Sequence, residues 1–268
     1  MNEIDVSHFF TTFAGISLTI KGKKMKAFTR IFLLLVFISP AFQSCLFNYK
    51  NINGNGELVR KEFSISDYNA IVLNLPAEII YHNDSISAPY LQVYTDSSIV
   101  PYIRVVVEDN KLIITSEDDV NLRATHFKIF TNSKTLEAVN VNGSGRIWLR
   151  GEVNAKTMGI DISGSGAVWA DSLYCEQARL HISGSGKMTL EGVSNYTELN
   201  VSGSGTIDAL NFSSLEAKAI VSGSGHIILS VGRKLDAIVT GSGTIKYKGN
   251  LDVEDKKIIG SGSITQIE

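Results

Sequence analysis

The sequence predicts an all-β fold, a single-stranded parallel β-helix (solenoid) built from repeats of about 20 residues. Seven Gly-Ser-Gly triplets recur with spacings of 21, 20, 19, 20, 18 and 19 residues, and a near-constant period is typical of stacked repeats. Apolar and polar residues alternate around each triplet, which is the pattern of a β-strand. Right-handed winding is expected, because parallel crossovers have that hand. The triplets are Gly143–Gly145, Gly164–Gly166, Gly184–Gly186, Gly203–Gly205, Gly223–Gly225, Gly241–Gly243 and Gly260–Gly262.

Each of about seven repeats is expected to supply a strand, a Gly-Ser-Gly bend, a second strand and a return loop. The glycines have the parity of the apolar residues, so both are predicted to point inward, where a Cβ would meet the opposite wall and where φ > 0 is accessible. A phosphate-binding loop is not indicated, because no helix is expected after any of the triplets, and a lysine, Lys187, directly follows only one of them. A calcium-binding repeat would need an aspartate in fixed register, which the triplets lack.

Residues 57–136 also alternate like strands but contain no triplet. We interpret them as a cap with degenerate early coils, followed by the Gly-Ser-Gly repeats over residues 137–268. Asp109-Asn110 lies between two apolar runs and predicts a hairpin turn. The sequence stops within a repeat at residues 264–268, which predicts an exposed sheet edge or an oligomer contact.

Residues 25–44 have the pattern of a secretion signal. A basic cluster that ends at Arg30 precedes the apolar run 31–38, which is shorter than the roughly 20 residues of a membrane span. The following Ser44-Cys45 resembles the lipobox of bacterial lipoproteins in its loose Bacteroidetes form. The resemblance implies lipidation of Cys45 and a membrane anchor; the alternative is an ordinary signal peptide with an incidental cysteine.

The segments on either side of this signal are short. Residues 1–24 are interpreted as a gene-start artefact or a leader, because Met25 directly precedes the signal. Residues 45–56 are predicted to be the lipidated cysteine and a flexible tether, because Asn and Gly are frequent there.

The mature chain resembles the auto-transporter adhesin head GIN domain family of Bacteroidetes over roughly residues 57–266. The residues that carry the resemblance are Phe63–Leu73 (FSISDYNAIVL), Asp109–Ile114 (DNKLII), Leu136–Gly145 (LEAVNVNGSG) and the later triplets. The resemblance implies a β-helical solenoid on exported, often lipid-anchored proteins, and it implies no catalytic residues.

No residue pattern indicates an enzyme, a cofactor or a metal site. The five histidines are scattered without metal-ligand spacing. Asp161, Asp171 and Asp208 occupy different places in their repeats, so no acid pair of a polysaccharide-cleaving β-helix is expected. A net charge of −2 gives no basis for nucleic-acid binding. Cys175 is expected to be a buried, inert thiol.

Trp148 and Trp169 are the candidate ligand contacts. They occupy the same place in successive repeats with outward parity, so stacking predicts that they lie side by side. Exposed paired aromatic rings can stack on sugars or contact a partner protein. The alternative is that a loop or the 57–136 segment covers them.

These observations predict a non-enzymatic, lipid-anchored cell-envelope protein of the outer membrane that presents a solenoid for adhesion or protein contact. Its expected partners are the membrane and a glycan or an envelope or host protein. One alternative is a periplasm-facing structural or sensory accessory, which the absence of acidic residues in the sequence after Cys45 (LFNYKN) slightly favours. A carbohydrate-active β-helix enzyme is the other alternative, and an aligned acid pair would support it.

Overall fold

The computed structural model describes residues 50–84 and 86–268, which are strands apart from turns and one short 3-10 helix, η3 (Val100–Tyr102). Among these residues no helix is long and apolar enough to cross a membrane. The strands are β1 (Lys50–Asn53), β2 (Leu58–Phe63), β3 (Ala70–Leu73), β4 (Glu78–Asn83), β5 (Leu91–Asp96), β6 (Ile103–Glu108), β7 (Lys111–Ser116), β8 (Val120–Arg123), β9 (Phe127–Ser133), β10 (Ala138–Gly143), β11 (Arg146–Gly164), β12 (Ala167–Gly184), β13 (Lys187–Gly203), β14 (Thr206–Gly223), β15 (His226–Gly241), β16 (Thr244–Lys248), β17 (Val253–Gly260) and β18 (Ser263–Gln266).

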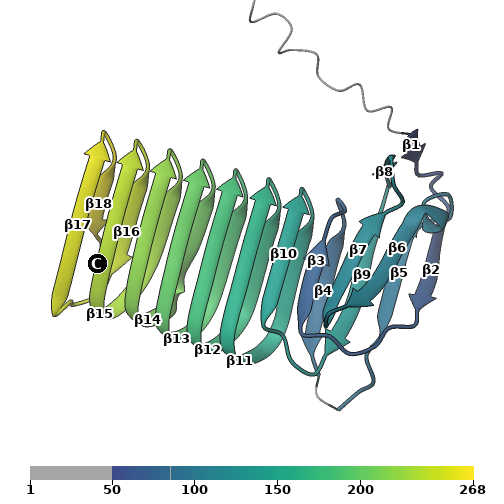
Figure 1. The fold of residues 1–268 in the computed structure, drawn as a ribbon, viewed down its shortest axis with the longest axis horizontal. Coiled ribbons are helices and arrows are strands. Elements are labelled where there is room, and N and C mark those ends of the chain that lie inside the picture. The colour runs from purple at the N-terminus through teal and green to yellow at the C-terminus, as the bar shows by residue number, and fades with distance from the viewer. Residues whose placement is uncertain (1–49, 85) are drawn as a thin grey trace, which may run out of the picture. The chain divides into compact units, whose positions relative to one another are not determined.

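The repeats form the predicted parallel β-helix, in which each coil stacks on the next (Figure 1). Each of β11 to β15 runs from one triplet to the next as one long bent strand, so the predicted return loop is wrong. The bend opposite the triplet is a register shift, as between Leu149 and Glu152 of β11. We call the part of a coil after its triplet the first leg and the part before the next triplet the second leg.

The core is a column of apolar side chains between the two legs. In β11 this column contains Ile147 and Leu149 from the first leg and Ile160 and Ile162 from the second, and each of them is buried. Parallel register places Ile147 beside Val168 and Ile160 beside Leu180 on the next coil. A coil of this length cannot bury its own apolar face, so stacking supplies the burial that stabilises it.

The two glycines of a triplet have different roles, which corrects the prediction that both point inward. Gly203 has φ +120° and lies near the surface, in a backbone conformation that side chains rarely adopt. Gly205 is buried, and a Cβ there would lie 2.6 Å from Cγ2 of Ile182 and 2.9 Å from the carbonyl oxygen of Gly186. The first glycine therefore makes the turn, and both leave room for the previous coil, because a Cβ on Gly203 would lie 2.6 Å from the carbonyl oxygen of Gly184.

Residues 57–136 extend both legs of the solenoid. The first-leg sheet continues from β11 through β4, β9, β5 and β2, and the second-leg sheet continues from β10 through β3, β7 and β6. The outer strands pair antiparallel, including the β6–β7 hairpin predicted at Asp109-Asn110, where φ is +49° and +59°. The order of the strands in the two sheets differs from their order in the chain. β3 lies between β10 and β7 in one sheet, and β4 lies between β11 and β9 in the other.

The prediction of a flexible tether is wrong for residues 50–56. β1 pairs in parallel with β8, and the carboxylate of Asp96 accepts hydrogen bonds from the backbone N–H of Gly56 (2.7 Å) and Thr125 (2.7 Å). Burial raises the pKa of Asp96, but hydrogen bonds led by the Thr125 hydroxyl outweigh it, so the pKa is lowered. Residues 45–49, Cys45 included, lie outside the described residues, as does the signal segment.

Replacement of Gly205 by alanine should destabilise the solenoid by about 1–3 kcal/mol, because the new Cβ overpacks a buried corner. Ser204→Ala is the matched control: Ser204 is exposed in the same triplet, so its loss should change stability by less than about 0.5 kcal/mol. Urea unfolding followed by circular dichroism measures both variants. Equal midpoints for the two would refute this account of the corner.

Candidate functional site

Trp148 and Trp169 lie side by side on the outer surface of the first-leg sheet, as the sequence predicts. They are register partners on β11 and β12, and their rings are stacked with centroids 4.1 Å apart and planes 9° apart. Both side chains are half-buried. This geometry establishes their position, and their contact with a ligand remains a prediction.

The tryptophans belong to a longer apolar row. Trp148 pairs with Ile80 on β4, and Ile80 pairs with Phe130 on β9. Phe130 packs edge-to-face on Tyr94 of β5, with ring centroids 5.5 Å apart. We call this row the aromatic face; its residues are Tyr94, Phe130, Ile80, Trp148 and Trp169.

The sequence analysis missed Tyr94 and Phe130. Their strands carry no triplet, so nothing in the sequence fixes the register that brings them into line with Trp148. Both side chains lie on the face of their strands opposite to the buried residues Val93 and Ile129, as alternation along a strand requires.

The tryptophan end of the aromatic face is a closed stack. The Arg150 guanidinium lies 4.4 Å from the ring centroid of Trp148 and is held by Asp171 at 3.2 Å. With Trp169 on its other side, Trp148 has both ring faces occupied. The Trp148 Nε1 atom is buried without a hydrogen-bond partner, as is Oγ1 of Thr189, the register neighbour of Trp169 on the next coil. A sugar ring therefore has little access to the faces of Trp148.

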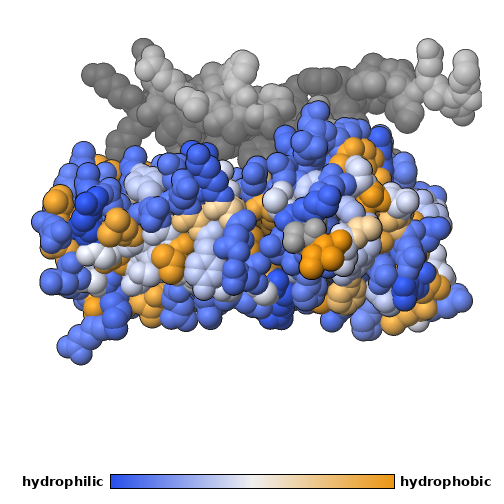
Figure 2. Space-filling view, turned by 90° about the horizontal axis from the view of Figure 1, so that it is seen from below, coloured by the Kyte–Doolittle hydropathy of each residue, from blue (hydrophilic) through white to orange (hydrophobic). Residues whose placement is uncertain are grey.

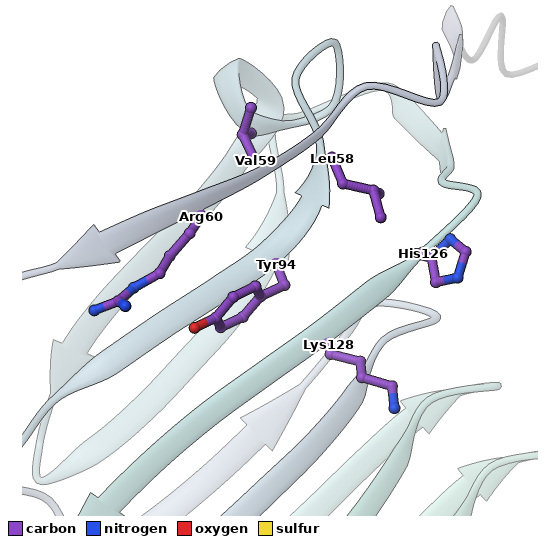
Figure 3. Close-up of a pocket in the computed structure, with 6 residues that line it drawn as sticks. All are labelled: Leu58, Val59, Arg60, Tyr94, His126 and Lys128. Carbon is purple, nitrogen blue, oxygen red and sulfur yellow. The ribbon is translucent and has the colours of Figure 1, made fainter.

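The Tyr94 end is hollowed instead. A hollow of about 260 Å³ is lined by Tyr90, Gln92, Tyr94 and Phe130. A neighbouring hollow of about 290 Å³ lies on the other side of Tyr94, where Leu58 supplies aliphatic surface. Figure 3 shows the Tyr94 ring between the side chains of Arg60 and Lys128, with His126 on the far side from Arg60.

Basic groups line the second hollow. Arg60, His126 and Lys128 contribute to its wall, and no aspartate or glutamate does. The nearest acidic partners lie outside the lining: Glu62 bonds Arg60, and Glu78 lies 3.7 Å from the Lys128 Nζ. The arrangement combines an aromatic ring, aliphatic surface and cationic hydrogen-bond donors, which suits an anionic or polyhydroxylated ligand.

Figure 2 shows one face of the molecule, on which hydrophobic side chains occur in small groups among hydrophilic ones.

The aspartates considered for glycoside cleavage are not aligned. Asp161 is the register partner of His181, Asp208 of Thr189, and Asp171 is paired with Arg150. Buried hydroxyls of Ser194, Thr197 and Ser214 bond one another at 2.5–3.1 Å. Within residues 50–84 and 86–268, no group of three or more His, Cys, Asp or Glu side chains is placed to hold a metal ion.

Cys175 lies near the bend that joins the two legs of β12. It is half-buried, whereas the sequence predicted a buried thiol. It lines an open surface hollow with Tyr174 and Val193. Burial raises the pKa of its thiol to about 11, so at neutral pH the thiol is protonated and a poor nucleophile.

Comparison with known proteins confirms the family resemblance. The family model "Putative auto-transporter adhesin, head GIN domain" matches residues 67–250. A search of curated proteins finds no match.

Solved structures from Bacteroides and Parabacteroides have the same fold. A putative adhesin from Bacteroides fragilis is 28% identical, with a TM-score of 0.77 and coverage of 81% of this chain and 100% of its own. A putative lipid binding protein from Parabacteroides distasonis is 30% identical, with a TM-score of 0.71 and coverage of 82% and 100%. A putative adhesin from the same species is 25% identical, with a TM-score of 0.68 and coverage of 81% and 100%.

Alkylation of Cys175 by iodoacetamide should be slow at pH 8, on the order of a hundredfold slower than that of an ordinary cysteine, because only the thiolate reacts. Its pKa is raised, so the rate should keep rising until the pH passes about 11. Mass spectrometry of the peptide that contains Cys175 measures the rate, with urea-unfolded protein as the control. Equal rates in the folded and unfolded protein would be inconsistent with a protected thiol.

Proposed function

Because the chain belongs to the auto-transporter adhesin head GIN domain family, we propose that it is a non-enzymatic, lipid-anchored cell-envelope protein that binds glycans through its aromatic face. The family description names adhesion, which is a binding role. The stacked coils support this proposal, because they present side chains on a sheet that is fixed by backbone pairing on both sides.

The observation that carries the proposal is the pair of hollows on either side of Tyr94. Sugars are recognised by aromatic rings together with hydrogen-bonding side chains, and here Tyr94 and Phe130 lie beside Gln92, Arg60 and Lys128. The tryptophan stack extends the same face, with Trp169 and Arg150 both packed on the Trp148 ring. The ligand would thus lie mainly over β2, β5 and β9, and the tryptophans would flank it.

Binding of an acidic lipid is a second candidate. The hollow in Figure 3 joins the aliphatic side chain of Leu58 to the basic Arg60 and Lys128, which suits an apolar chain beside an anionic headgroup. One of the solved relatives carries the description of a lipid binding protein. Vesicles that contain phosphatidylglycerol test this candidate, because such binding would require Arg60 and Lys128 and would weaken with salt.

The anchor and the location rest on the sequence. A lipidated Cys45 would tie the protein to a membrane through a short segment, because strand pairing already begins at Lys50. The folded part would then lie close to the membrane surface. Exposure on the outer face of the outer membrane would fit adhesion, and a periplasmic position would fit a structural or sensory accessory.

Tyr94→Ala in the full chain should weaken glycan binding by about tenfold, since loss of an aromatic contact costs about 1.4 kcal/mol. Tyr174→Ala is the matched control, because the two tyrosines are similarly exposed, at 37% and 42%, and Tyr174 lies away from the aromatic face. A polysaccharide array followed by titration calorimetry measures the affinities. Failure of every glycan to bind, or equal losses in the two variants, would overturn the proposal.

Cys45→Ala should abolish incorporation of an alkyne-labelled fatty acid and release the protein from the membrane fraction, because no other cysteine is preceded by a signal segment. Cys175→Ala should keep the label. Retention of the label in Cys45→Ala would contradict lipidation at this residue. Protease treatment of intact cells then places the protein: digestion supports the adhesin, and protection until the outer membrane is broken supports the periplasmic accessory.

A further inference from the structure

The last coil leaves two sheet edges open. β17 pairs with β15 and β18 pairs with β16, and neither has a second strand partner among residues 50–84 and 86–268 (Figure 1). Every residue of β17 is exposed, including Val253, Ile258 and Ile259, which are 51%, 47% and 51% exposed. An open edge presents unpaired backbone N–H and C=O groups that can pair with another strand.

Charged side chains cover the end of the apolar column at this edge. Glu254 and Lys256 are the register partners of the buried Leu235 and Ala237, so they have inward parity. The Lys256 Nζ lies 2.5 Å from the Glu254 carboxylate and donates a hydrogen bond of 2.7 Å to the Tyr247 hydroxyl. A partner that only buried apolar surface would leave these charges without water, so the edge favours a partner that forms a strand.

The outward residues of β17 (Val-Glu-Asp-Lys-Lys-Ile-Ile-Gly) are complementary to their own reverse when the strand is centred on Lys256. A two-fold axis perpendicular to a sheet pairs two copies of a strand antiparallel and keeps their inward sides together. On the outward side, this register sets Asp255 opposite Lys257 of the second copy and Val253 opposite Ile259, each twice by symmetry. Opposite charges and paired β-branched residues both stabilise directly opposed positions.

On the inward side, the same register sets the two copies of Lys256 opposite each other. Each is bonded to its own Glu254, and the Glu254 of the other copy is its diagonal neighbour. Each Glu254 lies directly opposite the inward Ile258 of the other copy. The register centred on Asp255 has the same number of opposite-charge pairs, Glu254 with Lys256 twice, and one like-charge pair of two aspartates, but it sets the apolar Val253 against Lys257. The pairing of Val253 with Ile259 therefore favours the register centred on Lys256.

We propose that the C-terminal edge is a homodimer interface, in which β17 pairs antiparallel with β17 of a second copy around a two-fold axis at Lys256. The pairing joins two solenoids end to end and continues the second-leg sheet from one copy into the other. Both cap ends, with their aromatic faces, are left free. The occupant of this edge is a second copy of the chain, since the complementarity is of the strand with itself.

The test is a charge exchange across the interface. The full chain, in mild detergent, is followed by sedimentation velocity over a concentration series. Lys257→Asp sets two aspartates opposite each other at two symmetric positions and should weaken dimerisation by about tenfold or more. The double variant Asp255→Lys/Lys257→Asp restores opposite charges and should restore the dimer.

Lys246→Asp is the matched control. Lys246 is an exposed residue of β16, one coil from the edge, so this variant makes the same change in net charge and should dimerise normally. A monomer at all concentrations, or a double variant that dimerises no better than Lys257→Asp, would overturn the proposal. Circular dichroism verifies that each variant is folded, and the result does not depend on whether the aromatic face binds a glycan.

Discussion

The hydrogen bonds that cross from one Gly-Ser-Gly corner to the next hold the coils of this protein in register. The N–H of Ser204 donates to the carbonyl oxygen of Gly184 at 2.9 Å, and the N–H of Thr206 donates to that of Gly186 at 3.0 Å. The same two bonds recur at 2.9–3.1 Å along the repeats, beginning with Ser165. From the second triplet on, a Cβ on either glycine would collide with the previous coil. The corners can therefore approach this closely only because both residues lack a Cβ. Without this register, the apolar residues of neighbouring coils would not meet in one column.

The same register also arranges the side chains of the outer surface. Residues at equivalent places in successive coils become neighbours at the spacing of strands in a sheet, about 4.8 Å, which is why Trp148 and Trp169 stack. The row continues into Ile80 and Phe130 because β4 and β9 pair in parallel with the same alignment. A surface row of this kind needs no loop to position it, and its residues come from distant parts of the chain.

The two ends of the solenoid cover the end of the apolar column in different ways. At the cap end, antiparallel strands β2, β5 and β6 extend both sheets beyond the last parallel coil. At the C-terminal end, Glu254 and Lys256 replace apolar residues at inward positions and are bonded to each other and to Tyr247. Inward charges at an edge prevent non-specific stacking, while the backbone remains available for a strand of matching charge pattern.

The sequence by itself determined the solenoid, because its period and alternation are local properties that can be counted, and a coil with an apolar face has to stack. It also placed Trp148 beside Trp169, since equal positions in equal repeats must align. Tertiary structure alone decided what lies next to them. β3 lies between the repeats and β7, and β4 lies between the repeats and β9, which is not their order in the chain. Non-local pairing also ordered residues 50–56 through β8 and Asp96 and brought Tyr94 and Phe130 onto the aromatic face. These contacts join segments without a repeat, so no spacing in the sequence records which strands pair.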